Sequence, residues 1–245
     1  MVEHFHGKEG VTGSNPVPGL SLCRPATSRS ERKITITPLP YEPPVVVGRG
    51  SRDPDVPLVV LLHGRGSDEE AIIGLADRLP ENAAYLAVRA PIAEGDGYAW
   101  FANRGIGRPI AESLDATIKW FREWLAGVAG PDRPVTLVGF SGGAAAVGGL
   151  LLDDPDRFEG AAILYGTLPF EAGLDTSPGR LAGTQVFVAQ GESDRVIPVE
   201  LQGRTWQYLH QDSGATVTSN RDESGHEISE AALLALGEWV EERIS

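Results

Sequence analysis

A serine flanked by glycines stands between an apolar run and a run of small residues in the middle of this chain. Residues 134–138 are short, β-branched and bounded by Pro and Gly, which predicts a buried strand. Residues 139–143 read Gly-Phe-Ser-Gly-Gly, and residues 144–152 predict a helix that begins with small side chains. Glycine permits a sharp turn or a close approach of two backbones. This order of strand, tight turn and helix predicts that Ser141 stands above a sheet as a nucleophile elbow.

Apolar runs alternate with helical patterns from residue 33 onward. The predicted strands cover residues 33–40, 43–48, 57–64, 83–91, 134–138, 160–166, 184–191 and 215–220. The predicted helices cover residues 67–80, with Ser67 as the N-terminal cap, and then residues 110–125, 144–152, 199–211 and 228 onward. Near-continuous apolar strands separated by helices indicate a mostly parallel sheet covered on both faces. We therefore predict an α/β fold in one domain, residues 33–245.

Residues 1–32 differ from the rest of the chain in composition. They mix Gly, Ser, Pro and charged residues without a period, which predicts a disordered tail. His4 and His6 lie in this tail, and two histidines at that spacing do not by themselves indicate a metal site, so we predict none there. The single cysteine, Cys23, excludes an internal disulfide framework. The segment lacks the apolar core of a signal peptide, so we expect a cytoplasmic protein.

The charge of the chain narrows its possible partners. Its formal net charge is −13, whereas nucleic acids and anionic membranes are bound by basic surfaces. Hydrophobic residues make up 41% of the chain, yet no apolar run approaches the ~20 residues of a membrane span. We expect neither nucleic-acid binding nor stable membrane association, and the sequence gives no indication of oligomeric state.

Ser141 needs a base, because a serine hydroxyl is a poor nucleophile at neutral pH. A chain with 30 glycines can contain Gly-x-Ser-x-Gly by chance, so the interpretation depends on the residues that follow. Of the histidines beyond the tail, His63 ends a strand, where a packing or turn role is expected, and His210 ends a helix. His226 lies in a polar loop after the last strand. Such a loop lies at the carboxyl edge of a parallel sheet, where ligands commonly bind. We predict that His226 is the base.

The acid that orients His226 is expected between Ser141 and His226, at the end of a strand. Asp194 meets this requirement, because it follows the predicted strand 184–191. Asp222, four residues before His226, is the competing carboxylate. The order serine, acid, histidine is that of an α/β-hydrolase triad.

Four segments together resemble a known family. They are LLHGRGSDEE, GFSGG, GESDRVIP and GHEIS, spread from about residue 58 to 240. In order and spacing they are similar to motifs of the phospholipase/carboxylesterase group of α/β-hydrolases, which includes acyl-protein thioesterases and small bacterial carboxylesterases. The resemblance implies the α/β-hydrolase fold, with Ser141 as nucleophile, Asp194 as acid and His226 as base. It implies an oxyanion hole from the backbone N–H groups of Arg65 and Gly142, and no cofactor.

The chain departs from the family pattern beside the serine. Many members carry Gln after the serine and a further Gly before the Ala, where this chain has Gly142 and Ala144. The backbone N–H of the oxyanion hole does not depend on these side chains. The acyl pocket beside the hole is expected to differ in shape.

These features predict a serine hydrolase that cleaves a small-molecule carboxylic ester. A thioesterase or protein deacylase with the same triad, and a non-catalytic ligand-binding protein on this fold, are the alternatives. The loops 91–109 and 166–183 are long for such a sheet but too short for a separate cap domain. We expect an open pocket with Trp100 or Phe101 as an apolar wall, and a preference for short-to-medium acyl chains.

Overall fold

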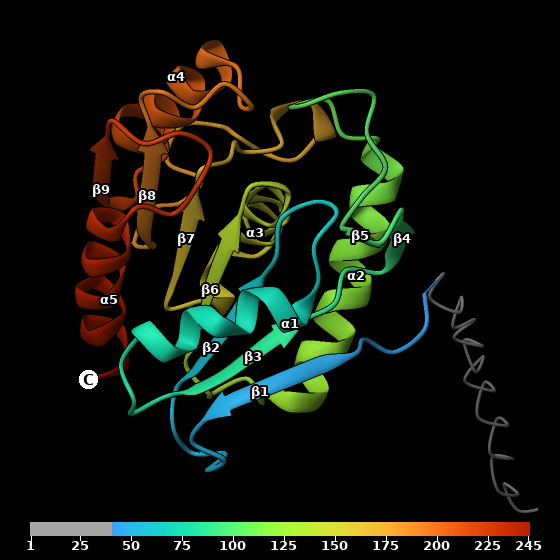
Figure 1. Cartoon of the computed structure of the whole chain (residues 1–245), viewed down its shortest axis with the longest axis vertical. Coiled ribbons are helices and arrows are strands. Elements are labelled where there is room, and N and C mark those ends of the chain that lie inside the picture. The colour runs from blue at the N-terminus through green and yellow to red at the C-terminus, as the bar shows by residue number, and fades with distance from the viewer. Residues whose placement is uncertain (1–40) are drawn as a thin grey trace, which may run out of the picture. The chain divides into compact units, whose positions relative to one another are not determined.

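A twisted sheet forms the centre of the protein (Figure 1). The computed structural model describes residues 41–245, and within them the main sheet has the strand order β1-β3-β2-β6-β7-β8-β9. The strands are β1 (Val46–Gly50), β2 (Leu58–Leu62), β3 (Ala84–Val88), β6 (Val135–Phe140), β7 (Gly160–Leu164), β8 (Gln185–Gly191) and β9 (Thr216–Asp222). β1 is antiparallel to β3, and the other neighbouring pairs are parallel. This is the predicted α/β-hydrolase fold, and the described residues contain no separate cap domain.

Helices cover both faces of the sheet. They are α1 (Glu69–Ile72), α2 (Ala111–Val128), α3 (Gly142–Asp153), α4 (Val199–Gln207) and α5 (Glu230–Ile244). Helices α2 and α3 pack on one face, and α1 and α5 pack on the other. Shorter helical turns are Ile73–Arg78, Pro155–Arg157, Phe170–Ala172 and Tyr208–Asp212, the last of which extends α4.

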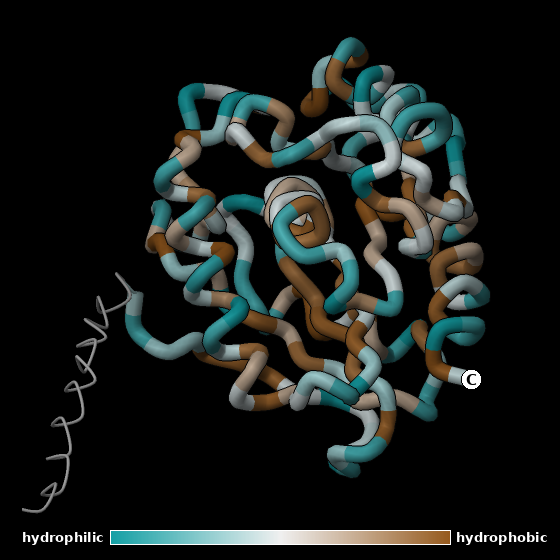
Figure 2. Tube along the Cα trace, turned by 180° about the vertical axis from the view of Figure 1, so that it is seen from behind, coloured by the Kyte–Doolittle hydropathy of each residue, from teal (hydrophilic) through white to brown (hydrophobic). Residues whose placement is uncertain are grey.

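β2 shows why the central strands are apolar along their whole length. All five of its residues are buried. Leu58, Val60 and Leu62 pack toward α2 and α3, whereas Val59 and Leu61 pack toward α1 and α5. Successive side chains of a strand point to opposite faces, so a strand covered on both sides needs apolar residues at every position. Figure 2 shows these hydrophobic strands (brown) inside the molecule.

Two local predictions differ from the structure. The first helix begins at Glu69, and its cap is Asp68, whose carboxylate accepts a hydrogen bond from the Ala71 N–H at 2.9 Å. Ser67, the expected cap, lies one residue outside it; aspartate and serine cap helices about equally well. The loop 91–109 contains a small antiparallel hairpin of β4 (Ile92–Glu94) and β5 (Gly97–Ala99).

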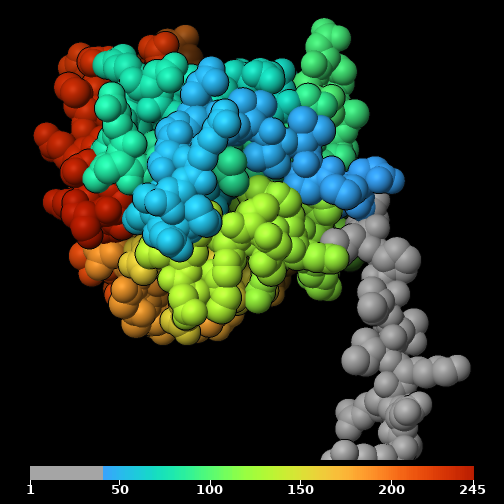
Figure 3. Space-filling view, turned by 90° about the horizontal axis from the view of Figure 1, so that it is seen from below, coloured from blue at the N-terminus to red at the C-terminus, as the bar shows by residue number. Residues whose placement is uncertain are grey.

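The first described residues lead into β1, an outermost strand of the sheet, whose start Val46 lies opposite Val88 at the carboxyl end of β3. Seen from below, the chain from residue 41 through β1 (blue) crosses the surface between α1 (teal) and α2 (yellow-green) (Figure 3). The predicted tail, residues 1–32, and the predicted strand 33–40 lie outside the described residues. Within residues 41–245 no helix combines the length and apolarity that crossing a membrane requires. The candidate site lies at the carboxyl edge of the sheet, where the loops after β6, β8 and β9 begin.

Candidate active site

Ser141 lies on a strained turn between β6 and α3. Its backbone has φ 54° and ψ −114°, a conformation that residues with a side chain rarely adopt. The neighbouring glycines make the turn possible. A Cβ on Gly139 would lie 2.4 Å from the Gly143 carbonyl oxygen, and a Cβ on Gly143 would lie 2.2 Å from the Leu62 carbonyl oxygen. The glycines therefore let α3 approach the end of β2 and hold the Ser141 hydroxyl above the sheet.

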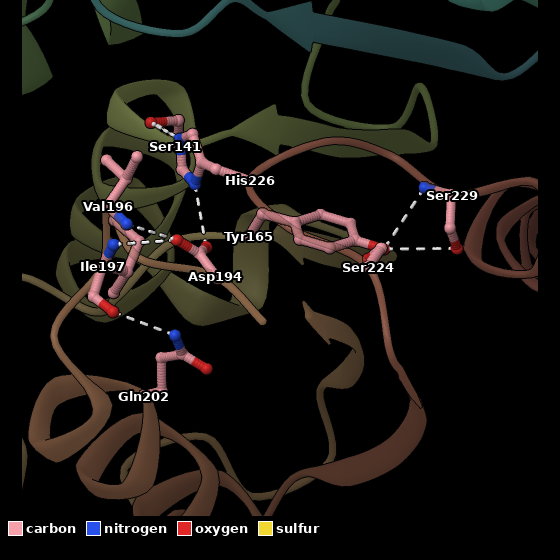
Figure 4. Close-up of polar contacts among 9 residues, drawn as sticks. All are labelled: Ser141, Tyr165, Asp194, Val196, Ile197, Gln202, Ser224, His226 and Ser229. Atoms are coloured by element: carbon pink, nitrogen blue, oxygen red, sulfur yellow. Dashed lines mark hydrogen bonds and ion pairs between the residues drawn. The ribbon is translucent and has the colours of Figure 1, made fainter. Parts of the chain in front are cut away.

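His226 and Asp194 complete a chain of hydrogen bonds to Ser141 (Figure 4). Nε2 of His226 is 2.8 Å from the Ser141 Oγ, and Nδ1 is 2.8 Å from the Asp194 Oδ2. Because a carboxylate only accepts, Nδ1 carries the proton and Nε2 is free to accept from the serine hydroxyl. This is the arrangement in which an imidazole acts as a general base.

The carboxylate of Asp194 is held at both oxygens. Its side chain is 1% exposed, and Oδ1 accepts hydrogen bonds from the N–H groups of Val196 at 2.7 Å and Ile197 at 3.0 Å. Oδ2 is thereby directed at His226. The Phe140 ring packs on the imidazole, with 5.1 Å between the ring centroids. The position of the imidazole is set by its neighbours on two sides.

The competing carboxylate, Asp222, has other partners. Its oxygens accept hydrogen bonds from the Ser224 N–H at 2.9 Å and the Ser229 hydroxyl at 2.5 Å. Burial alone would raise the pKa of Asp222, but the hydrogen bonds from Ser224, Ser229 and Tyr165 hold that pKa below its ordinary value. The structure brings Asp194 to His226, and it brings Asp222 to the ends of the loop that carries His226.

The two predicted oxyanion donors lie together beside Ser141. Arg65 follows β2, and a Cβ on Gly142 would be 3.1 Å from the Arg65 backbone nitrogen. Gly142 is the first residue of α3, so its N–H has no partner inside the helix. Both residues line the same cavity as Ser141. The side chain of Arg65 pairs with Glu94 through Nε at 2.6 Å and donates through Nη1 to the Phe101 carbonyl at 3.1 Å, which ties this loop to the β4–β5 hairpin.

A cavity of about 340 Å³ opens beside the Ser141 hydroxyl. Its lining is mostly apolar and comes from five loops and the start of α3. The lining residues are Arg65, Phe101, Asn103, Ile106, Gly107, Pro109, Ser141, Gly142, Ala145, Thr167, Leu168, Pro169, Val196, Ile197 and His226. Val196 and Ile197 were not predicted to line a pocket, although their place directly after Asp194 was a usable signal.

Of the two predicted wall residues, Phe101 lines the cavity and Trp100 does not. The prediction for Trp100 is wrong, because its ring is 2% exposed and packs beneath the loop against His63. The indole N–H donates to the His63 carbonyl at 2.8 Å. Trp100 and Phe101 lie at a bend directly after β5, and only the second of them reaches the cavity.

His63 is fully buried and takes the predicted packing role. Its Nδ1 lies 2.7 Å from the Gly64 carbonyl, and its Nε2 accepts from the Ala90 N–H at 3.1 Å. Burial lowers the pKa of His63, which keeps the ring neutral. Within residues 41–245 no group of three or more His, Cys, Asp or Glu side chains is placed to hold a metal ion.

Comparisons with known proteins agree with this architecture. A model of the phospholipase/carboxylesterase family matches residues 45–244. MhqD of Bacillus subtilis (strain 168) is 25% identical over 191 residues, which is 76% of this chain and 94% of MhqD. A carboxylesterase from Mesorhizobium loti is 26% identical, with a TM-score of 0.66 over 76% of this chain and 88% of that one. The Bacillus cereus carboxylesterase, at 24% identity, a TM-score of 0.72 and coverage of 82% and 94%, shares the fold.

Proposed function

This chain belongs to the phospholipase/carboxylesterase family of hydrolases, and we propose that it hydrolyses short-to-medium acyl carboxylic esters through an acyl-enzyme on Ser141. The observation that carries the proposal is the hydrogen-bonded chain from Asp194 through His226 to Ser141, which ends at an apolar cavity. The carboxylesterase named among the similar structures supports the same reaction class.

The reaction begins when Ser141 Oγ attacks the ester carbonyl while Nε2 of His226 takes the hydroxyl proton. The N–H groups of Arg65 and Gly142 stabilise the negative oxygen of the tetrahedral intermediate. His226 then returns its proton to the departing alcohol, leaving the acyl group on Ser141. A water molecule, deprotonated by His226, then attacks the acyl carbon. The bond from that carbon to Ser141 Oγ breaks, His226 returns the proton to Oγ, and the carboxylic acid is released.

The cavity supports the proposed acyl length. Phe101, Ile106, Leu168 and Ile197 give it apolar walls, and each buried methylene contributes roughly 0.8 kcal/mol. A volume of about 340 Å³ holds a limited number of carbons, so longer chains extend into solvent. The acyl chain is therefore expected to bind along these walls and the alcohol to leave on the open side.

The test combines labelling with a single substitution. A fluorophosphonate should modify Ser141 in the folded protein, and Ser141→Ala should abolish both labelling and hydrolysis of p-nitrophenyl butyrate. By analogy with other triads the rate should fall on the order of 10⁴–10⁶-fold. A Ser141→Ala protein that keeps more than about a tenth of the wild-type rate would overturn the mechanism. Matched oxygen and sulfur esters, assayed on the same preparation, separate esterase from thioesterase activity.

A further inference from the structure

The loop that carries His226 is tied together at its two ends. It leaves β9 at Asp222 and enters α5 at Ser229, the N-cap of that helix. The Asp222 Oδ2 accepts from the Ser229 hydroxyl at 2.5 Å, and Oδ1 accepts from the Ser224 N–H at 2.9 Å. One carboxylate therefore joins the start of the loop to its end.

A buried tyrosine hydroxyl also contacts both ends of this loop, and Figure 4 shows it beside Ser224 and Ser229. Tyr165 follows β7, is 1% exposed and has a φ of 47°. Its hydroxyl lies 3.3 Å from Asp222 Oδ2, from the Ser224 hydroxyl and from the Ser229 N–H. A tyrosine hydroxyl donates one hydrogen bond and accepts others, so it matches an acceptor at Asp222 and donors at Ser224 and Ser229. The unusual backbone of Tyr165 is consistent with a ring held in place by this network.

The same loop is joined to the loop that carries Asp194. The Ser193 N–H donates to the Ser224 carbonyl at 3.0 Å, and the Glu192 N–H donates to the Asp222 carbonyl at 2.7 Å. A Cβ on Gly191 would lie 2.4 Å from the Ser224 carbonyl oxygen, so only glycine allows this approach. A shift of the histidine loop would therefore disturb the acid loop as well.

We infer that Tyr165 and Asp222 are positioning residues that hold the His226 loop so that the imidazole spans Asp194 and Ser141. The inference rests on the proposed function of Ser141. Neither residue lines the cavity, so both act through the loop and not on the substrate. A displacement of about 1 Å at a catalytic group can lower a rate by about 10²-fold, so the position of the His226 loop should affect kcat.

Tyr165→Phe tests the inference, because it removes the hydroxyl and keeps the ring. Rates are expressed per active site titrated with a fluorophosphonate, so that misfolded protein does not contribute. We expect kcat for p-nitrophenyl butyrate to fall about tenfold with KM within twofold of wild type, and the labelling rate of Ser141 to fall in parallel.

Tyr85→Phe is the matched control. Tyr85, in β3, is also 1% exposed, and its hydroxyl donates to the Pro80 carbonyl at 2.6 Å rather than to the His226 loop. This variant should lose stability but keep kcat per active site within twofold of wild type. If both variants lose kcat equally, or if Tyr165→Phe keeps the wild-type kcat, the positioning role of Tyr165 is refuted.

Three further variants keep the test decisive. If Tyr165→Phe does not fold, Asp222→Asn carries the same expectation, with a smaller loss than Asp222→Ala because the amide keeps one acceptor oxygen. Ser141→Ala, assayed in parallel, addresses the proposed function alone: activity that survives Ser141→Ala refutes that function. If Ser141→Ala loses activity and Tyr165→Phe keeps the wild-type kcat, only the positioning role of Tyr165 is refuted.

Discussion

Nδ1 of His226 lies 2.8 Å from Oδ2 of Asp194, although 32 residues separate the two along the chain. The pairing follows from the sheet, because β8 and β9 are parallel neighbours with Gly191 opposite Asp222. Asp194 and His226 each follow the carboxyl end of one of these strands, so their loops meet at the same edge. Asp222 is nearer to His226 in sequence but bonds to Ser224 and Ser229.

Asp194→Asn should damage activity far more than Asp222→Asn. An amide at position 194 can favour the wrong tautomer of His226, and in comparable triads this costs about 10⁴-fold in kcat. Asp222→Asn leaves Asp194 in place and should cost about tenfold, through the position of the loop. Steady-state kinetics on the two purified variants decide the matter. Equal losses, or the reverse order, would move the acid to Asp222.

Catalytic efficiency should rise over the first few acyl carbons and then level off. Each added methylene gains apolar contact along Phe101, Ile106 and Leu168 until the chain leaves the cavity. The measurement is kcat/KM for p-nitrophenyl esters from acetate to palmitate. A value that climbs steadily to palmitate, or rises sharply at a lipid interface, contradicts the proposed acyl range.

Glu94→Gln should shift the substrate preference toward anionic acyl groups. Glu94 compensates the charge of Arg65, a residue that lines the cavity. Removing that compensation gives an attraction of about 1 kcal/mol for a carboxylate nearby in a solvated site, or about fivefold in kcat/KM. The readout is the ratio of kcat/KM for p-nitrophenyl hemisuccinate to that for p-nitrophenyl butyrate. Glu171→Gln, outside the cavity, is the control, and an unchanged ratio in Glu94→Gln would refute the idea.

Gly143→Ala should destabilise the fold, whereas Gly203→Ala should not. The new Cβ at position 143 meets the Leu62 carbonyl at 2.2 Å, and forcing the two apart costs about 1–3 kcal/mol. Gly203 lies in α4 with no atom within 4 Å of the added carbon, so alanine there should stabilise by about 0.5–1 kcal/mol. Urea unfolding measures both changes in the free energy of unfolding. Similar values for the two variants would contradict the packing argument.

The buried His63 should make stability fall as the pH drops below about 6.5. Burial lowers the pKa of His63 in the folded protein, so the unfolded chain binds a proton first as the pH falls. The neutral ring contributes fully to the free energy of unfolding above about pH 6.5. Below that pH the contribution is lost, at no more than about 1.4 kcal/mol per pH unit. The free energy of unfolding of His63→Gln should therefore change less between pH 7 and pH 5 than that of wild type. The exposed His210→Gln controls for the substitution itself, and a wild-type slope in His63→Gln would count against this assignment.

The region around Ser141 was predictable because its constraints are local. Gly139 and Gly143 are needed where β6 turns into α3, and both lie within two residues of the serine. The apolar strands, their alternation with helices and the order of the site residues are also properties of short segments. These features were enough to predict a mostly parallel α/β fold and to select Ser141 and His226 as candidates.

Only the tertiary structure decided which side chains meet. The choice of Asp194 over Asp222 depends on the register of β8 against β9, which no short segment encodes. Trp100 packs on His63 whereas its neighbour Phe101 lines the cavity, and this division depends on how the segment after β5 packs on the sheet. Tyr165 gave no signal in the sequence, because its hydroxyl finds Asp222, Ser224 and Ser229 only after β7, β9 and α5 have packed. Local backbone preferences depend on neighbouring residues, whereas contacts between distant segments depend on the packing of the whole sheet.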